Sequence, residues 1–221
     1  MKNFRTTLYE MRTYLTLWAS QMFSGLGSAM TAYALVIWSY TQEGSALKTA
    51  LLMVSSYAPY VVLSIFAGAL SDRWDKKKTM LICDALAAVC TVFTLVLLQQ
   101  GQLKIWHLYV INMVNGTMNT VQRPASDVAV SRLLPKKYYQ KVGGLGYFSR
   151  SVNSILTPVI ATTILGLAGM EAVIAFDLVS FAVAFLVLGL FIRIPKGEEA
   201  STRKEGLLQA AGEGIGYLKK E

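Results

Sequence analysis

Charged residues are scarce in this chain of 221 residues, at 15% of the total, whereas a soluble domain carries roughly a quarter. Hydrophobic residues make up 54%, so a lipid bilayer is the expected solvent. Cysteine and histidine are nearly absent, with two and one residues respectively, and no metal site is readable. Cys83 and Cys90 share one predicted helix, where about 10 Å of rise between them excludes a disulfide.

The sequence also lacks a glycine-rich phosphate loop and any pairing of a nucleophile with a base. ATP-driven transport by this chain is therefore not expected, and neither is a cofactor. A membrane-embedded enzyme would need catalytic residues that the sequence does not offer. We expect the chain not to be an enzyme.

Six apolar stretches are each long enough to cross a bilayer core, which takes roughly 20 residues. Long unbroken runs indicate helices, because barrel strands alternate over about ten residues. The sequence thus predicts an all-α membrane protein, a six-helix bundle over residues 1–192. A charged segment, residues 193–221, follows it as the start of a linker. The six predicted spans are 14–39, 47–70, 79–98, 104–123, 145–168 and 171–192.

The basic residues fall almost entirely between alternate spans, which assigns an orientation by the positive-inside rule. The net charge of +8 therefore indicates topology and not a nucleic-acid partner. The side opposite the termini holds only Lys48 and Lys104. Both ends are predicted to be cytoplasmic, with basic clusters on that side at Lys2, Arg5, Arg12, Arg73, Lys76, Lys77, Lys78, Arg123, Arg132, Lys136, Lys137, Lys141, Arg193, Lys196, Arg203, Lys204, Lys219 and Lys220.

The loop between the second and third spans reads Gly68-Ala-Leu-Ser-Asp72-Arg73-Trp-Asp-Lys76-Lys77. This pattern, in this topological position, resembles the signature of the major facilitator superfamily. Segments 18–27, 80–84, 123–125, 176–181 and 213–218 are similar to the drug–proton antiporter branch that includes macrolide-efflux and siderophore-export proteins. The resemblance runs over almost the whole chain and covers the N-terminal half of a twelve-helix transporter.

The resemblance implies efflux of small amphipathic molecules by alternating access, driven by protons, in a bacterial cytoplasmic (inner) membrane. The implied partners are lipid, substrate, protons and a C-terminal six-helix half. A non-transporting six-helix scaffold or receptor that self-associates is the alternative.

Two groups of residues are candidates for the mechanism. A conformational latch at the cytoplasmic rim is predicted from charge and from the resemblance, comprising Gly68, Asp72, Arg73, Lys76, Lys77, Arg123 and Asp127. Acids inside a span are functional by default, and polar side chains at helical spacing favour a cavity over lipid. The structural alternative for the latch is an orientation signal only, and that for Asp177 is a neutral or hydrogen-bonded acid that joins two helices. For Asp84 it is pairing with an inner-face Arg or Lys, and for the amides it is interhelical hydrogen bonding. The proton or substrate candidates are Asp177, Asp84, Gln21, Asn112, Asn115, Asn119 and Asn153.

Overall fold

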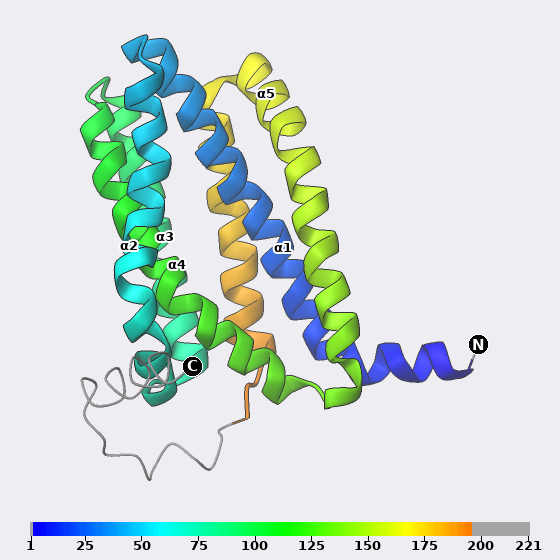
Figure 1. Cartoon of the computed structure of the whole chain (residues 1–221). Helices are drawn as coiled ribbons and strands as arrows, with labels where there is room; N and C mark the ends of the chain where they lie inside the picture. Colours follow the sequence, from blue (N-terminus) through cyan, green and yellow to red (C-terminus); the bar gives the residue numbers. More distant parts are fainter. Residues whose placement is uncertain (1, 196–221) are drawn as a thin grey trace.

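The computed structural model describes the backbone of residues 2–195 and the side chains of residues 9–64 and 74–195. This part of the chain is helical throughout and has no strand (Figure 1), which confirms the predicted all-α class. Its elements are α1 (Lys2–Glu43), α2 (Ala46–Arg73), α3 (Lys76–Gln99), α4 (Ile105–Leu133), the short 3-10 helix η1 (Lys136–Tyr138), α5 (Tyr139–Leu186) and the π-helical turn η2 (Val187–Phe191).

Helix α5 consists of two segments that run in opposite directions (Figure 1). The reversal occurs at Gly169, whose φ of 82° lies in the left-handed region that a residue with a Cβ seldom occupies. The predicted break between the last two spans falls at this residue. We call residues 139–168 the outgoing segment and residues 170–191 the returning segment, which includes η2.

Polar residues at the other reversals end one helix and start the next. Ser45 caps α2 by accepting a hydrogen bond from the backbone N–H of Lys48, and Asp75 caps α3 by accepting one from Lys78. Gly101, with a φ of 64°, allows the turn that follows α3. Asp75 thus starts α3 directly after the end of α2.

Within the described residues, four helices are long and apolar enough to span a bilayer: Tyr9–Glu43, Ala46–Ser64, Lys76–Gln99 and Lys136–Phe191. The last of these contains the reversal at Gly169. Helix α4 is absent from this group because asparagine and charged residues recur along it. Large apolar side chains such as Val61 and Leu167 lie on the outer surface, as expected of helices that face lipid.

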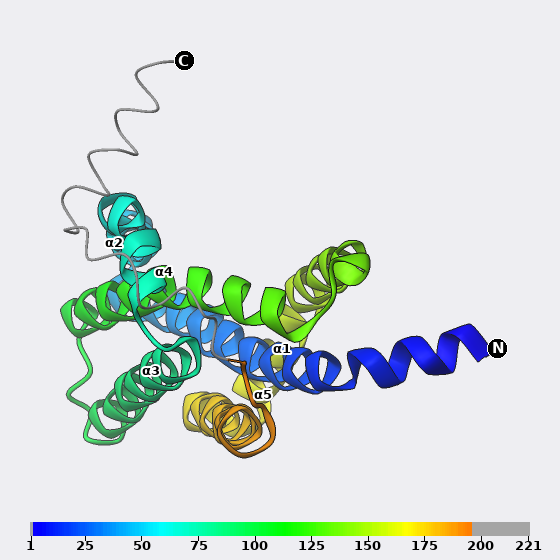
Figure 2. The same cartoon turned by 90° about the horizontal axis from the view of Figure 1, so that it is seen from below.

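Two helix pairs form the main contacts of the bundle: α1 with α5, and α2 with α4. Viewed from below (Figure 2), α4 and α1 run through the middle of the bundle, with α3 and the returning segment of α5 on one side. The core clusters around Met30, Leu108 and Ile174, which are almost fully buried. The start of the α1 span is fastened to η1 by Glu10, which lies 2.6 Å from both Lys137 Nζ and Tyr138 Oη.

Glycine residues, which have no side chain, allow both helix pairs to approach closely. A Cβ added at Gly27 of α1 would lie 2.9 Å from the Cα of Asp177 and would also overlap Ser180 Oγ. A Cβ at Gly116 of α4 would overlap the carbonyl oxygen of Ser56 in α2. Small residues of this kind stabilise helix pairs in lipid, where burial alone provides no attraction between helices.

Gly27→Ala should destabilise the purified chain by about 1–3 kcal/mol, because backbone atoms of the returning segment would have to move. Gly166→Ala is the matched control, since a Cβ there has no neighbour within 4 Å. Thermal unfolding of both variants in the same detergent tests this. Equal stability of the two variants would contradict the close approach at Gly27.

Candidate functional site

Asp177 lies in the contact between α1 and the returning segment of α5. It is 4% exposed, and its Oδ1 accepts a hydrogen bond of 2.9 Å from Ser28 Oγ. Ser180 Oγ donates to the backbone carbonyl of Asp177, also at 2.9 Å. The carboxyl group is therefore part of a hydrogen-bonded helix contact.

Asp84 lies where α1, α3 and α4 meet. Its Oδ1 accepts a hydrogen bond of 2.6 Å from Gln122 Nε2 on α4. Gln21 of α1 faces the same carboxyl group, and its own Nε2 is buried without an acceptor. The partner in the structure is thus an amide, in place of the Arg or Lys that the sequence suggested as the structural alternative.

The predicted asparagine stripe on α4 is divided among three environments. Asn112 donates through Nδ2 to the carbonyl oxygen of Leu52 at 3.2 Å and so joins α4 to α2. Asn115 is half-buried and its Oδ1 has no donor, whereas Asn119 is exposed. On the outgoing segment, Asn153 Oδ1 is likewise buried without a donor. Buried amides without protein partners on α1, α4 and α5 are positions where water or a ligand would bind.

The predicted latch is described only in part. Gly68, Asp72 and Arg73 end helix α2, and their side chains lie outside the described residues. Lys76 is buried at the start of α3. Arg123 and Asp127 are both exposed on α4, and among the described side chains neither forms an ion pair.

Lys77 fastens the start of α3 to the end of the returning segment. Its Nζ donates to the carbonyl oxygens of Gly189 and Ile192, at 2.8 Å in each case. These carbonyls belong to the end of the π-helical turn, where backbone acceptors lack helical donors and a cation is favourable. Arg132 of α4 also donates to the carbonyl of Pro195, at 3.4 Å.

Grooves between helices indent the described surface, and two of them lie near the candidate residues. The first, about 620 Å³, is almost wholly apolar and lies between α2, α3 and α4, with Leu63, Ile82 and Val121 among its walls. The second, about 480 Å³, lies between α1, α4 and the outgoing segment, and carries polar groups. We call this second one the tyrosine groove; its lining is Tyr14, Asp127, Val130, Ser131, Tyr139, Val142, Gly143, Gly146, Tyr147 and Arg150.

A model of the Major Facilitator Superfamily matches residues 17–220. The chain belongs to the Major Facilitator Superfamily. This is a superfamily of transporters, so the expectation that the chain is not an enzyme is confirmed at the family level. Together with the apolar helices, membership identifies a multi-pass membrane protein.

Curated relatives of the superfamily protein come from bacteria. Macrolide efflux protein A of Streptococcus pyogenes is 25% identical over 94% of this chain and 51% of its own length. Macrolide efflux protein A of Enterococcus faecalis is 26% identical over 80% of this chain and 54% of its own length. The "Uncharacterized MFS-type transporter YfiS" of Bacillus subtilis is 26% identical over 93% and 49%, respectively. The resemblance to macrolide-efflux proteins is confirmed, and the chain spans about half the length of these relatives.

Sequence reasoning missed the two polar arrangements that depend on distant segments. Gln122 and the tyrosines of the groove do not belong to any sequence motif, so no signal in the sequence identified them. Lys77 was a candidate because of its charge and its place in the signature. Its carbonyl partners, however, lie more than a hundred residues later in the sequence. Only the folded bundle of this superfamily member brings them together.

Lys77→Met should free the end of the returning segment, because two charge-assisted hydrogen bonds are lost. We expect amide hydrogen exchange at residues 189–194 to accelerate by about tenfold or more, which corresponds to about 1.4 kcal/mol of lost protection. Lys78→Met is the control, since the side chain of Lys78 is exposed. Unchanged exchange in Lys77→Met would contradict the assigned role.

Proposed function

We propose that the chain forms one six-helix half of a bacterial exporter that works by alternating access. The observation that carries this proposal is the similarity to macrolide efflux proteins over nearly the whole chain and about half of their length. The reversal at Gly169 supports six membrane crossings, because it divides α5 into two helical segments. Rocking of two such bundles about a midplane site is the usual mechanism of transporters built from repeats.

The proposed orientation places both ends of the bundle in the cytoplasm, in the inner membrane. The basic residues that lie near the α2–α3 and α4–α5 connections support it. A second six-helix half would follow the linker that begins at residue 193. The hydrogen bonds from Lys77 to Ile192 and from Arg132 to Pro195 support an exit of that linker from the bundle at this end.

We further propose that the substrates are small amphipathic molecules and that protons drive their export. Asp84 is the preferred proton site, because its carboxyl group is half-buried between three helices and has an amide as its partner. An acid in such a position changes its interactions when it is protonated, which couples protonation to helix packing. Asp177 is assigned the structural contact between α1 and α5, with proton binding as the alternative.

The other candidate residues keep their proposed roles in this scheme. Gln21, Asn115 and Asn153 present buried amide atoms without protein partners, and these support a polar path through the bundle. The latch remains a proposal for Gly68, Asp72, Arg73, Lys76, Lys77, Arg123 and Asp127. In it, Asp72, Arg73, Arg123 and Asp127 would form a network at the cytoplasmic rim that is closed in one state of the transporter and open in the other.

Asp84→Asn should abolish proton-driven efflux, because an amide binds no proton at physiological pH. The measurement is efflux of a macrolide from bacterial cells, with and without a protonophore. The cells express the full reading frame, which comprises this chain and the proposed second half. We expect at least a tenfold loss of the protonophore-sensitive rate. Glu171→Gln, at an exposed acid beside the α5 reversal, is the control. Full protonophore-sensitive efflux by Asp84→Asn would refute this site, and absence of efflux from the parent protein would refute the exporter.

A further inference from the structure

The first groove, of about 620 Å³, lies between α2 and α3 with α4 as its floor, and we call it the apolar groove. Helix α4 packs along both neighbours, whereas α2 and α3 make few contacts with each other in the described part of the chain. The described candidates for the latch, the proton site and the polar path do not line this groove. The proposed export mechanism therefore leaves it without a role.

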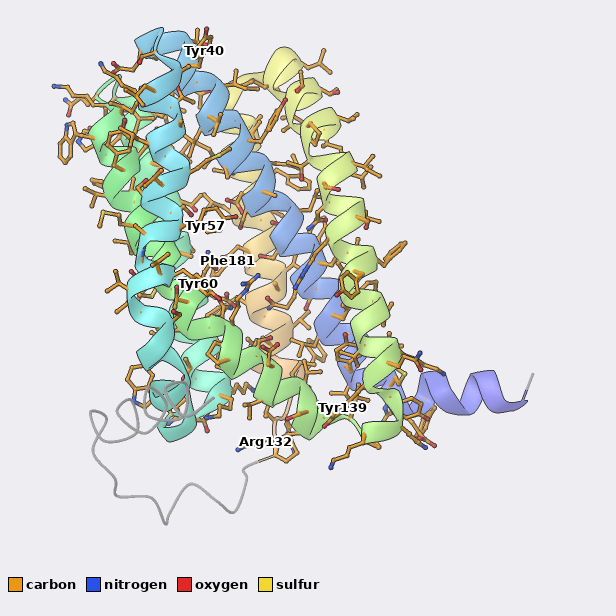
Figure 3. All side chains as sticks on the ribbon, viewed as in Figure 1. Tyr40, Tyr57, Tyr60, Arg132, Tyr139 and Phe181 are labelled. Carbon is orange, nitrogen blue, oxygen red and sulfur yellow. The ribbon has the colours of Figure 1, made fainter. Side chains whose placement is uncertain are left out.

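The apolar groove runs from one end of the bundle into the span. Trp74 and Lys78 lie at its mouth, beside the start of α3, and Leu86 lies just over two helical turns deeper. Eight residues of helix rise by roughly 12 Å, which is most of one leaflet's share of a hydrocarbon core about 30 Å thick. Figure 3 shows the α2–α3 connection at the lower end of the bundle, which also carries the labelled Arg132 and Tyr139. The groove thus has the depth of one lipid leaflet.

The walls of the apolar groove suit a hydrocarbon chain. Ile82 and Leu86 of α3 are both exposed to it. The two threonines of the lining, Thr79 and Thr117, donate their hydroxyl protons to carbonyl oxygens of their own helices at 2.9 Å. Neither hydroxyl has a proton left to donate, so nothing below the mouth anchors a polar ligand. An acyl chain would fill this recess through van der Waals contacts.

The mouth of the apolar groove carries a cation and an aromatic ring. Lys78 is exposed, and no acid among the described side chains pairs with it. Asp75, the acid of the lining, is engaged at the start of α3, where its Oδ1 accepts a hydrogen bond of 2.9 Å from the backbone N–H of Lys78. The partial positive charge of the helix start also offsets it. Trp74 is exposed, and tryptophan is enriched at the level of lipid headgroups. Basic pockets between helices at this level bind acidic headgroups.

We propose that the apolar groove binds one anionic phospholipid. Its phosphate contacts the ammonium group of Lys78, and one acyl chain lies between α2 and α3 against Ile82 and Leu86. Trp74 packs beside the headgroup. The bound lipid braces α2 against α3, because it fills the recess that the two helices leave open above α4. This inference does not depend on export, since binding can be measured without transport.

The test is lipid binding to the full reading frame, purified in detergent and examined by native mass spectrometry. The protein is titrated with phosphatidylglycerol, which is anionic, or with phosphatidylethanolamine, whose ammonium group Asp75 would attract. The populations of lipid-bound and lipid-free protein give the dissociation constants. We expect the first phosphatidylglycerol to bind at least fivefold more tightly than phosphatidylethanolamine.

Two pairs of variants locate the site. Lys78→Gln should weaken phosphatidylglycerol binding by about fivefold, the contribution of one basic residue near an anionic surface. Lys136→Gln removes the same charge from an exposed lysine outside the lining and should bind like the parent. Leu86→Trp should fill the groove and weaken the binding of both lipids. Val89→Trp, at an exposed position of α3 outside the lining, is its matched control. Thermal unfolding in the same detergent establishes that all four variants are folded.

Three results would overturn the proposal. The first is binding of phosphatidylethanolamine as tight as that of phosphatidylglycerol, and the second is an equal effect of Lys78→Gln and Lys136→Gln. The third is an equal effect of Leu86→Trp and Val89→Trp, which is also the result expected if the second half covers the groove. A full reading frame that binds the lipid as predicted but exports nothing would support the groove and refute only the exporter.

Discussion

The close contact between α1 and the returning segment of α5 is the constraint on which the bundle depends. In lipid, burial provides no attraction between helices, and van der Waals packing with a few hydrogen bonds must hold them together. Gly27 permits the approach, and Ser28 donates to the buried carboxyl of Asp177 across it. Because the returning segment follows the reversal at Gly169, this contact also sets the position of the outgoing segment and of the tyrosine groove.

Polar interactions are distributed along the bundle in a way that separates stability from proposed function. The Ser28–Asp177 and Asn112–Leu52 hydrogen bonds each join a pair of helices. Lys77 instead closes the end of the returning segment at two backbone carbonyls. Asp84 and Asp127 differ from all of these: the partner of Asp84 is a neutral amide, and no lysine or arginine among the described side chains pairs with Asp127. Uncompensated acids in a membrane bundle are the groups whose interactions a proton or a cation can change.

The helical class and the break at Gly169 follow from composition and from turn residues, which act over a few positions. The acids of the spans were also readable, because charge within an apolar run is rare. Their partners were not: Gln122 meets Asp84 only through the packing of α3 on α4, and Lys77 meets Ile192 across most of the chain. The tyrosine groove could not be predicted from the sequence for the same reason, since Tyr14 and Tyr139 come from segments that are distant in the sequence.

Proton-coupled export is the central claim, and substrate-dependent proton movement tests it most directly. Inverted membrane vesicles bearing the full reading frame would be energised until their lumen is acidic, and a macrolide would then be added while luminal pH is followed by a fluorescent dye. The account predicts an immediate rise in luminal pH that requires both the protein and the macrolide. Accumulation of the macrolide in the vesicles without any change in luminal pH would contradict it.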